Sequence, residues 1–444
     1  MTRYETPEHV AAELARFVPR RVASILDPAV GKGALLRPIA KRLLSTGCQV
    51  VCVDRDPTVL ATVASDYGSR FGRRMHIVES DFLSWRHDEL PRTIRNGFDC
   101  VLMNPPFAGM KSDWVPVGLK PQERNQDTLT QFAPLEAAFV VKSLSLLKDG
   151  GRLLAIVPGS VVQSHRTRWL RQRMVELGTI LHVHELAPYT FPGLEARVYL
   201  LVFEKRGSNR QSVLSNHDLS SPESLRVRLG GSNGELRFDY GFHFAERLLV
   251  ELQDNLGASW RALSSVASIY RGSEKSPRGG SYSVHTCDYS QGLWHASPRH
   301  RALRRTTPSA VVAKDDILVK RVGRDCPYSF GRAIGITGVP CSDCVFILRP
   351  RQARVSTRVL FALRIVFGNP QLAPLIEKGT GASYLTESSL RAVSLPIDLA
   401  CLYPGLFAHY RKAVTGGRGE EMKQIEARVR RYIVRRVPLF LPAS

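Results

Sequence analysis

The stretch Phe98-Asp-Cys-Val-Leu-Met-Asn104-Pro105-Pro106-Phe107 is the most informative segment of the sequence. Its first six residues are typical of a buried strand, and the two prolines that follow cannot extend that strand. The Asn104 amide oxygen and the Pro105 carbonyl can both accept hydrogen bonds from one planar amino group. Phe107 adds an aromatic face on which a base can stack. The segment therefore indicates a site for an amino group attached to a ring.

Residues 1–206 around this segment alternate short apolar runs with helical patterns, which is typical of a parallel α/β sheet. Helices are expected at Glu8–Val18, Leu35–Leu44 and Leu135–Leu147. The seven expected strands are Val22–Leu26, Gln49–Val53, Met75–Val78, Phe98–Met103, Arg152–Val157, Ile180–His184 and Arg197–Phe203. We therefore expect a doubly wound α/β domain.

Acidic side chains follow the first three expected strands. Asp27 opens the glycine loop Asp27–Gly33, Asp54 ends the second strand, and Asp81 follows the third. The carboxyl ends of parallel strands meet at one edge of a sheet, so these acids should line one crevice. Each signal alone also fits a tight turn or a solvated strand end. The recurrence at three successive strand ends favours a nucleotide-like ligand.

Together these motifs resemble, in type and order, the catalytic domain of S-adenosylmethionine-dependent amino-methyltransferases from bacterial restriction–modification systems. The order is similar to that of the γ-type N6-adenine enzymes, and Tyr4-Glu5-Thr6-Pro7 is similar to their leading Thr-Pro segment. The resemblance implies a Rossmann-like sheet of seven strands and a second, α+β domain for target recognition. Lys32 departs from the small residue usual in the glycine loop, and Phe107 replaces the commoner Tyr.

The same resemblance assigns roles to individual residues, with S-adenosyl-L-methionine as cofactor and no metal. The catalytic residues it implies are Asn104, Pro105, Pro106, Phe107 and Phe191, the last as a second aromatic that packs against the base. The cofactor-binding residues it implies are Thr6, Asp27, Ala29, Gly31, Gly33, Asp54, Asp81, Phe82 and Asn104.

The charge of the chain is strongly positive. Its formal net charge is +22, and residues 247–444 hold 30 basic and 14 acidic side chains. A positive field of this size suits a polyanion such as nucleic acid. Apolar runs such as Val198–Phe203 are far shorter than the roughly 20 residues of a membrane span, so no membrane partner is expected. Eight scattered cysteines argue for a reducing cytoplasm rather than a disulfide scaffold.

Composition divides the chain into three parts. Residues 1–206 form the expected catalytic domain, the Gly- and Ser-rich residues 207–246 a linker, and residues 247–444 the target-recognition domain. Because the sequence opens directly with the Thr-Pro segment, no fused nuclease domain is expected before it. Residues 405–437 are expected to form a helix pair broken at Gly416-Gly417. A basic cluster lies near its end: Arg428, Arg430, Arg431, Arg435 and Arg436.

The sequence thus predicts a site-specific DNA adenine N6-methyltransferase that flips its target base out of the duplex. Its partner would be double-stranded DNA. A cognate restriction endonuclease, encoded separately, is a further expected partner. Four alternatives stay open. They are methylation of RNA adenine, of cytosine N4 or of a protein glutamine amide, and a specificity subunit without catalysis. The basic C-terminal region argues against the protein substrate, and the intact Asn104, Asp54 and Asp81 argue against a subunit without catalysis.

Overall fold

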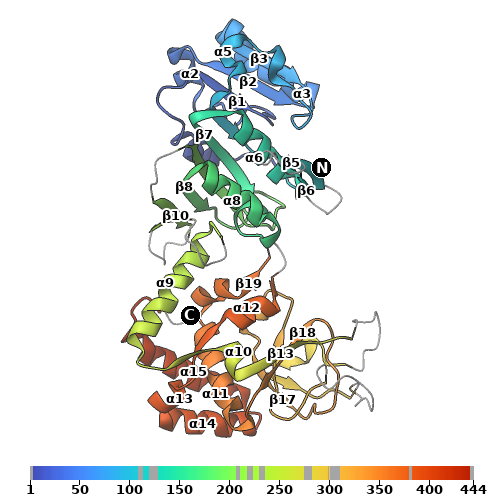
Figure 1. The fold of residues 1–444 in the computed structure, drawn as a ribbon, viewed down its shortest axis with the longest axis vertical. Coiled ribbons are helices and arrows are strands. Elements are labelled where there is room, and N and C mark those ends of the chain that lie inside the picture. The colour runs from blue at the N-terminus through green and yellow to red at the C-terminus, as the bar shows by residue number, and fades with distance from the viewer. Residues whose placement is uncertain are drawn as a thin grey trace. The chain divides into compact units, whose positions relative to one another are not determined.

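The computed structural model resolves the chain into two compact units, Met1–Tyr240 and Gly241–Ser444 (Figure 1). The described residues are 4–108, 114–119, 129–206, 211–217, 224–229, 236–274, 283–298, 300, 311–379 and 383–440. No helix within these residues is long and apolar enough to cross a membrane.

The first unit is built on a nine-stranded sheet with the order β11-β10-β8-β9-β7-β4-β1-β2-β3. Its strands are β1 (Ser24–Asp27), β2 (Gln49–Asp54), β3 (Met75–Glu79), β4 (Phe98–Met103), β7 (Leu147–Pro158), β8 (Gly178–Glu185), β9 (Val198–Lys205), β10 (Ser212–Asn216) and β11 (Leu225–Val227). All seven strands predicted from the sequence are present. A separate hairpin, β5 (Trp114–Leu119) and β6 (Leu129–Pro134), follows β4 along the chain.

Two strands of this sheet were not predicted. β10 and β11 come from the segment 207–246, which the composition favours as a linker. β10 has five residues, three of them polar, and β11 has only three residues, so no apolar run marks either strand in the sequence. Residues 207–210, 218–223 and 230–235 of the same segment lie outside the described residues.

The sheet is mixed rather than purely parallel. β9 pairs antiparallel with both β7 and β8, whereas β3, β2, β1, β4 and β7 run parallel. The expectation of a parallel sheet is therefore wrong for β9. The reason is the connection: residues 186–197 between β8 and β9 contain no helix. A parallel return needs a long crossover, so the chain turns back antiparallel instead.

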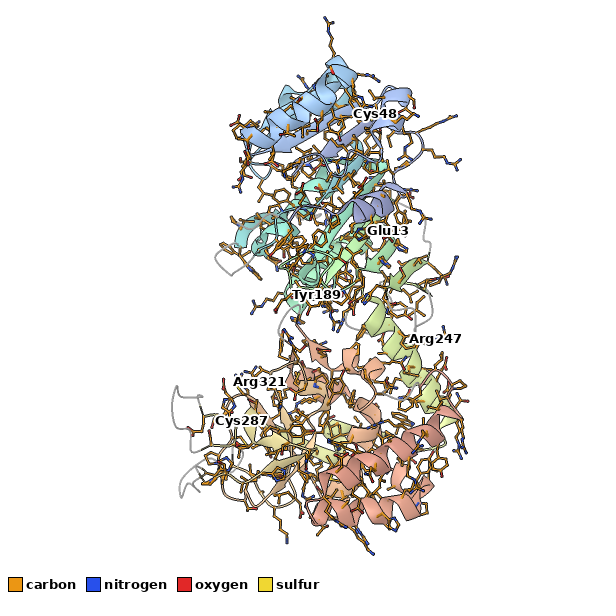
Figure 2. All side chains as sticks on the ribbon, turned by 180° about the vertical axis from the view of Figure 1, so that it is seen from behind. Glu13, Cys48, Tyr189, Arg247, Cys287 and Arg321 are labelled. Atoms are coloured by element: carbon orange, nitrogen blue, oxygen red, sulfur yellow. The ribbon has the colours of Figure 1, made fainter. Side chains whose placement is uncertain are left out.

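Helices cover both faces of the sheet. The main helices are α1 (Glu8–Ala15), α2 (Ala40–Thr46), α3 (Pro57–Val63), α6 (Leu135–Leu146) and α8 (Arg168–Leu177). On one face, Ile25 of β1 packs in a core cluster with Leu14 of α1. On the other face, the Ser143 hydroxyl of α6 lies 3.5 Å from the Met103 sulfur of β4. Figure 1 shows α6 and α8 in front of the sheet. Figure 2, the view from behind, shows α1, the helix that carries Glu13. The first unit is thus doubly wound.

β1 lies at the point where the strand order reverses. It pairs in parallel with β2 on one side and with β4 on the other. In open α/β sheets, ligands bind outside the carboxyl ends of the strands at such a switch point. The topology therefore places the ends of β1, β2 and β4, which are Asp27, Asp54 and Met103, around one crevice.

The second unit holds a six-stranded, mostly antiparallel sheet with the order β13-β18-β16-β17-β15-β14. Its strands are β13 (Ala267–Arg271), β14 (Tyr289–Ser290), β15 (Leu293–His295), β16 (Ile317–Lys320), β17 (Gly331–Ile334) and β18 (Val345–Pro350). Its main helices are α9 (Tyr240–Asn255), α11 (Ser356–Phe367), α14 (Pro404–Thr415) and α15 (Gly419–Val434). The helix pair broken at Gly416-Gly417 is therefore present as α14 and α15.

A buried ion pair ties α15 to α11. The Arg364 guanidinium donates to both Glu426 carboxylate oxygens, at 2.5 and 3.0 Å, and both side chains are buried. Arg430 also turns toward this pair, with its guanidinium 3.5 Å from Glu426. One member of the basic cluster expected from the sequence is therefore part of the interior. Arg428, Arg431, Arg435 and Arg436 remain exposed on α15 and just after it.

Candidate active site

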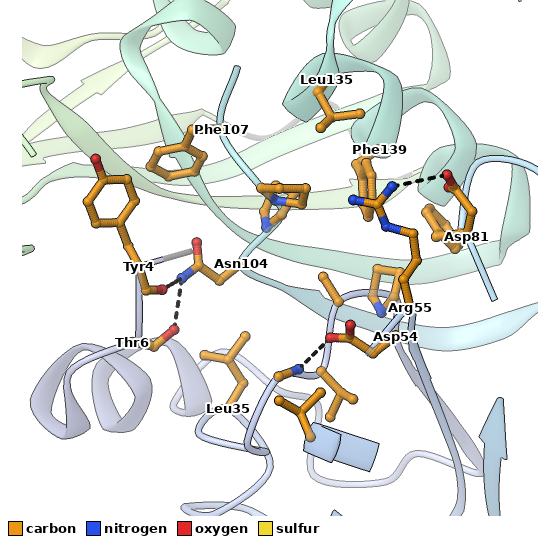
Figure 3. A pocket seen from close by; sticks show the side chains of 18 of the residues that line it. Tyr4, Thr6, Leu35, Asp54, Arg55, Asp81, Asn104, Phe107, Leu135 and Phe139 are labelled. Carbon is orange, nitrogen blue, oxygen red and sulfur yellow. Dashed lines mark hydrogen bonds and ion pairs between the residues drawn. The ribbon is translucent and has the colours of Figure 1, made fainter. Parts of the chain in front are cut away.

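A cavity of about 420 Å³ opens at the carboxyl ends of β1 to β4 (Figure 3). It lies where the switch point of the sheet predicts a ligand. Residues expected from the sequence that line it are Thr6, Ala29, Gly31, Asp54, Asp81, Phe82, Asn104, Pro105, Pro106 and Phe107. Segments nearly 100 residues apart in the sequence thus share one cavity.

The glycine loop after β1 is held in place by its own backbone and by Asp54. Gly31 and Gly33 have φ values of +50° and +75°, which favour glycine. The Gly31 amide donates to the Asp54 carboxylate at 3.0 Å, and the Val30 amide donates to the Val53 carbonyl at 3.1 Å. The loop therefore curls against the end of β2 with its backbone facing the cavity.

Asp54 is buried and accepts two backbone hydrogen bonds. One oxygen accepts from Gly31, and the other accepts from the Asp56 amide at 3.1 Å. A carboxylate oxygen can accept more than one hydrogen bond, so a side chain of this kind can hold a loop and also bind a ligand hydroxyl. Asp54 thus serves the loop and faces the cavity at once.

Asp27 and Gly33 do not line the cavity, although the resemblance implied cofactor contacts for both. Asp27 is buried, and its carboxylate accepts from the Ala29 amide at 3.2 Å. Burial, aided by the nearby Asp54 charge, raises the pKa of Asp27 to about 8 against the lowering effect of the Ala29 hydrogen bond. Its contribution is to the shape of the loop rather than to the cavity wall.

The third strand end supplies an acid and an apolar wall. The Asp81 carboxylate accepts from the Leu83 amide at 2.9 Å and pairs with Arg55 at 3.6 Å. Both partners of that ion pair are about half exposed, so its stabilisation is on the order of 1 kcal/mol or less. Phe82 is buried, and its ring centre lies 5.0 Å from that of Phe139. A planar apolar group can lie against this wall.

Asn104 is held in one orientation by the segment before α1. Its side-chain nitrogen donates to the Tyr4 carbonyl at 3.2 Å and to the Thr6 hydroxyl at 2.9 Å. Figure 3 shows these two bonds on one side of the amide and the amide oxygen on the other, toward Phe107. The half-buried Asn104 therefore presents an acceptor to the cavity.

Two aromatic rings flank that acceptor. Phe107 and Tyr4 have ring centres 6.3 Å apart and planes tilted by 38°, and both line the cavity. The chain just past Phe107 is fixed by Glu136 of α6. That buried carboxylate accepts from the Ala108 amide at 2.8 Å and from the Ser160 hydroxyl.

Phe191 lies apart from this group. Its side chain is 2% exposed and belongs to the core cluster that contains Leu200 and Val202. It borders a second cavity, together with Tyr4, Thr6 and other residues, and it does not line the first. In this conformation neither face of the ring is free for a base, because the core already covers it.

Several residues of the cavity were not predicted from the sequence. Tyr4, Arg55, Leu35, Leu135 and Phe139 line it. In the sequence, Leu35, Leu135 and Phe139 look like ordinary apolar core residues, so no local pattern marks them. Leu35 lies in the turns before α2, where the sequence favoured a helix over Leu35–Leu44, and Leu135 and Phe139 lie on α6. Tyr4 lies two positions before the predicted Thr6 in the sequence, and Arg55 directly follows the predicted Asp54. This proximity is the one sequence signal that could have identified Tyr4 and Arg55.

Residues 1–222 match the model of the family described as N-6 DNA Methylase. Among the curated relatives, the type II methyltransferase M.TthHB8I of Thermus thermophilus is 28% identical over 198 residues, covering 41% of this chain and 40% of that protein. The type II methyltransferase M.BsuBI of Bacillus subtilis is 25% identical over 177 residues, covering 36% of this chain and 34% of that protein. In both cases the match spans less than half of the relative's length.

Solved structures show more distant likeness. The M protein of the type I restriction enzyme EcoKI has a TM-score of 0.38 and 15% identity, covering 53% of this chain and 51% of that chain. The type IIG restriction endonuclease BpuSI has a TM-score of 0.42 and 13% identity, covering 98% of this chain and 65% of that chain.

Proposed function

This chain belongs to the N-6 DNA methylase family, and from that premise we propose that it is a site-specific DNA adenine methyltransferase. The methyl donor would be S-adenosyl-L-methionine, and the product would be N6-methyladenine in DNA. The enzyme would serve as the modification enzyme of a restriction–modification or phage-defence system. The orientation of Asn104 carries the proposal. Its amide oxygen faces the cavity because its nitrogen is committed to Tyr4 and Thr6.

The cavity suits the cofactor in size and in chemistry. Its volume of about 420 Å³ lies within the roughly 300–1,000 Å³ usual for small-molecule sites. Asp54 offers acceptors for ribose hydroxyls, and the Phe82–Phe139 wall offers an apolar surface for the adenine ring. The glycine loop lets the backbone approach the methionine part closely.

Asn104 and Pro105 would hold the amino group that is methylated. The bound cofactor supplies a sulfonium methyl group, which is electrophilic without a metal. Two acceptors, the Asn104 oxygen and the Pro105 carbonyl, draw the amino lone pair out of conjugation with the ring. Neither acceptor is basic enough to retain the proton that the nitrogen loses, so the proton leaves to water. The residues therefore act by holding and aligning the amino group.

The target adenine must leave the duplex to reach this cavity. Phe107 offers its ring as the stacking surface, and aromatic stacking is worth about 1–3 kcal/mol per base. Tyr4 is the nearest second ring, with a centre 6.3 Å from that of Phe107. The stacking role that the resemblance gives to Phe191 requires that ring to leave the core.

The second unit would supply most of the DNA affinity and the choice of site. Residues 247–444 carry +16 of the net charge of +22. Among the described residues, Arg428 and Arg431 on the exposed side of α15 make no ion pair. Next to them Tyr432 is 40% exposed and stacks on Tyr403, with ring centres 6.0 Å apart. Unpaired arginines beside an exposed ring suit a phosphate backbone.

The decisive experiment is to sequence modified bases in DNA from a host that expresses the full chain. We expect N6-methyladenine within one short recognition sequence. The matched control is Asn104→Ala, which should keep the fold and the cofactor affinity and abolish the methylation, because Asn104 faces the amino group. Turnover by this variant above a tenth of the wild-type value would count decisively against the role of Asn104.

The alternatives give different outcomes in the same experiment. N4-methylcytosine at a defined sequence would mean that the cavity methylates an amino group as proposed, but that the target base is cytosine. Methylated RNA together with unmodified DNA would mean that the substrate is RNA. Unmodified DNA and RNA, together with sequence-specific DNA binding, would favour a specificity subunit without catalysis. Each of these results contradicts the proposal in a distinguishable way.

A further inference from the structure

Resting on the proposed function, we infer that Thr6 is a positioning residue that fixes the Asn104 amide with its oxygen toward the substrate. The Thr6 hydroxyl accepts from the Asn104 side-chain nitrogen at 2.9 Å, and the Tyr4 carbonyl accepts from the same nitrogen at 3.2 Å (Figure 3). Both contacts lie on one side of the amide, and its oxygen points to the other side, toward Phe107. The resemblance to the family assigned Thr6 to the cofactor only.

The direction of the amide follows from the chemistry of these partners. A backbone carbonyl can only accept a hydrogen bond, whereas a side-chain amide has one donating and one accepting end. Rotating the Asn104 amide by half a turn would set its oxygen against the Tyr4 carbonyl, with two acceptors facing each other. The Tyr4 carbonyl therefore selects one of the two orientations.

The Thr6 hydroxyl oxygen adds a second acceptor for the same nitrogen, and this acceptor is held firmly in place. Thr6 is 9% exposed and precedes Pro7, whose carbonyl accepts from the Ala11 amide at 3.0 Å in the first turn of α1. Further along α1, Val10 and Leu14 are fully buried in the core. The start of α1 is thus anchored, and it carries both acceptors to the end of β4.

Losing the hydroxyl should affect the reaction more than cofactor binding. Without Thr6 as acceptor, the Asn104 nitrogen keeps only the Tyr4 carbonyl as a partner, and the amide can swing about that single bond. Its oxygen is then no longer held at the position where it accepts from the amino group. Only the step that needs a correctly placed amino group is then slowed.

The test compares Thr6→Val, which keeps the shape and removes the hydroxyl, with Thr6→Ser, which keeps the hydroxyl. We expect Thr6→Val to lower the single-turnover rate about 10- to 100-fold, the loss typical of a displaced catalytic group. Thr6→Ser should restore most of the rate. The affinity for S-adenosyl-L-homocysteine, measured by calorimetry, should stay within about twofold in both variants. Thr62→Val is the matched control, because Thr62 is exposed on α3 and its hydroxyl donates to the Thr58 carbonyl of the same helix.

A second readout does not depend on activity. With asparagine labelled by nitrogen-15, the Asn104 side-chain amide is identified by its loss in Asn104→Asp. In the wild type it should exchange slowly with solvent, because both of its hydrogens are bonded. Exchange should speed up in Thr6→Val and slow again in Thr6→Ser. If the Asn104 amide exchanges faster in Thr6→Val but the wild-type protein methylates no DNA, the positioning role of Thr6 is supported. Only the proposed DNA substrate is then refuted.

Two results would overturn the inference. The first is that Thr6→Val changes neither the exchange of the Asn104 side-chain amide nor the single-turnover rate. The other is a loss of S-adenosyl-L-homocysteine affinity as large as the loss of rate, since that pattern belongs to a cofactor contact and not to positioning.

Discussion

The Asp54 carboxylate accepts a hydrogen bond from the Gly31 amide at 3.0 Å, so the acid at the end of β2 holds the glycine loop that follows β1. This contact joins two motifs 23 residues apart in the sequence. It also means that an acid expected to bind the cofactor has a structural task in the cavity. If Asp54 binds the proposed cofactor, its substitution should weaken binding both by removing that contact and by releasing the glycine loop.

Asp54→Ala should weaken S-adenosyl-L-homocysteine binding by about 10- to 100-fold, because a hydrogen bond to a charged group contributes about 1.5–3 kcal/mol. Asp54→Asn keeps an oxygen that can accept from Gly31 and should lose less. Isothermal titration calorimetry on both variants gives the comparison. Equal affinities of Asp54→Ala and the wild type would exclude Asp54 from the cofactor site.

Asp27 should make the stability of the protein depend on pH. Its pKa is raised from 3.8 to about 8 in the folded state, so between these values the folded protein holds a proton that the unfolded chain has released. The free energy of unfolding should therefore fall as the pH rises from about 4 to about 8, by up to about 1.4 kcal/mol per pH unit from this group. Above about pH 8 this contribution is flat.

Asp27→Asn isolates that contribution, because the amide keeps the oxygen that accepts from Ala29 and cannot lose a proton. Urea unfolding between pH 5 and pH 9 should show a flatter profile for the variant than for the wild type. The variant should gain most over the wild type at the alkaline end. Parallel profiles would mean that Asp27 is already ionised at neutral pH.

The basic side of α15 should act through phosphate contacts. Each contact contributes a slope of about −0.9 to the plot of log binding constant against log salt. Arg428→Gln combined with Arg431→Gln should therefore make that slope shallower by about 2, for specific and non-specific duplexes alike. Fluorescence anisotropy at several salt concentrations measures it. Arg70→Gln with Arg73→Gln, two exposed arginines of the first unit, is the matched control.

The sequence predicts well which strand ends meet at the crevice, because that part of the geometry follows from a simple rule. Parallel strands end at one edge, so Asp54, Asp81 and Asn104 had to approach one another once their strands were recognised. The pair of hydrogen bonds that orients the Asn104 amide does not follow from this rule. It joins residues 98 and 100 positions apart through the packing of α1, and no local pattern encodes that packing.

The misjudged parts of the sheet have a similar cause. β10 is short and polar, so it gains its place by pairing with β8 and not by an apolar run of its own. The segment around Phe191 shows the same limit. A Phe-Pro-Gly turn has the same sequence whether its ring faces a substrate or the core, and the structure turns this ring into the core.

The burial of Phe191 leads to a prediction that separates the two roles. At 2% exposure the ring contributes to the core, and Phe→Ala substitutions in cores cost about 3–5 kcal/mol. Phe191→Ala should thus lower the melting temperature strongly and weaken binding equally to a normal duplex and to one with an abasic target. Phe191→Leu keeps an apolar side chain of similar volume and should cost less than about 1.5 kcal/mol.

The leucine variant carries the argument, because it remains folded and has no ring to stack. If Phe191 is a core residue, Phe191→Leu should still flip the base, which is seen as a rise in 2-aminopurine fluorescence at the target position on binding. If the ring leaves the core to stack on the base, Phe191→Leu should be stable yet bind the normal duplex more weakly than the abasic one, with a smaller fluorescence rise. Phe107→Leu is the comparison, because that ring already lines the cavity beside Asn104 and should show the stacking defect. A stable Phe191→Leu with the same defect as Phe107→Leu would establish that the ring moves, and the core position would then be its resting state.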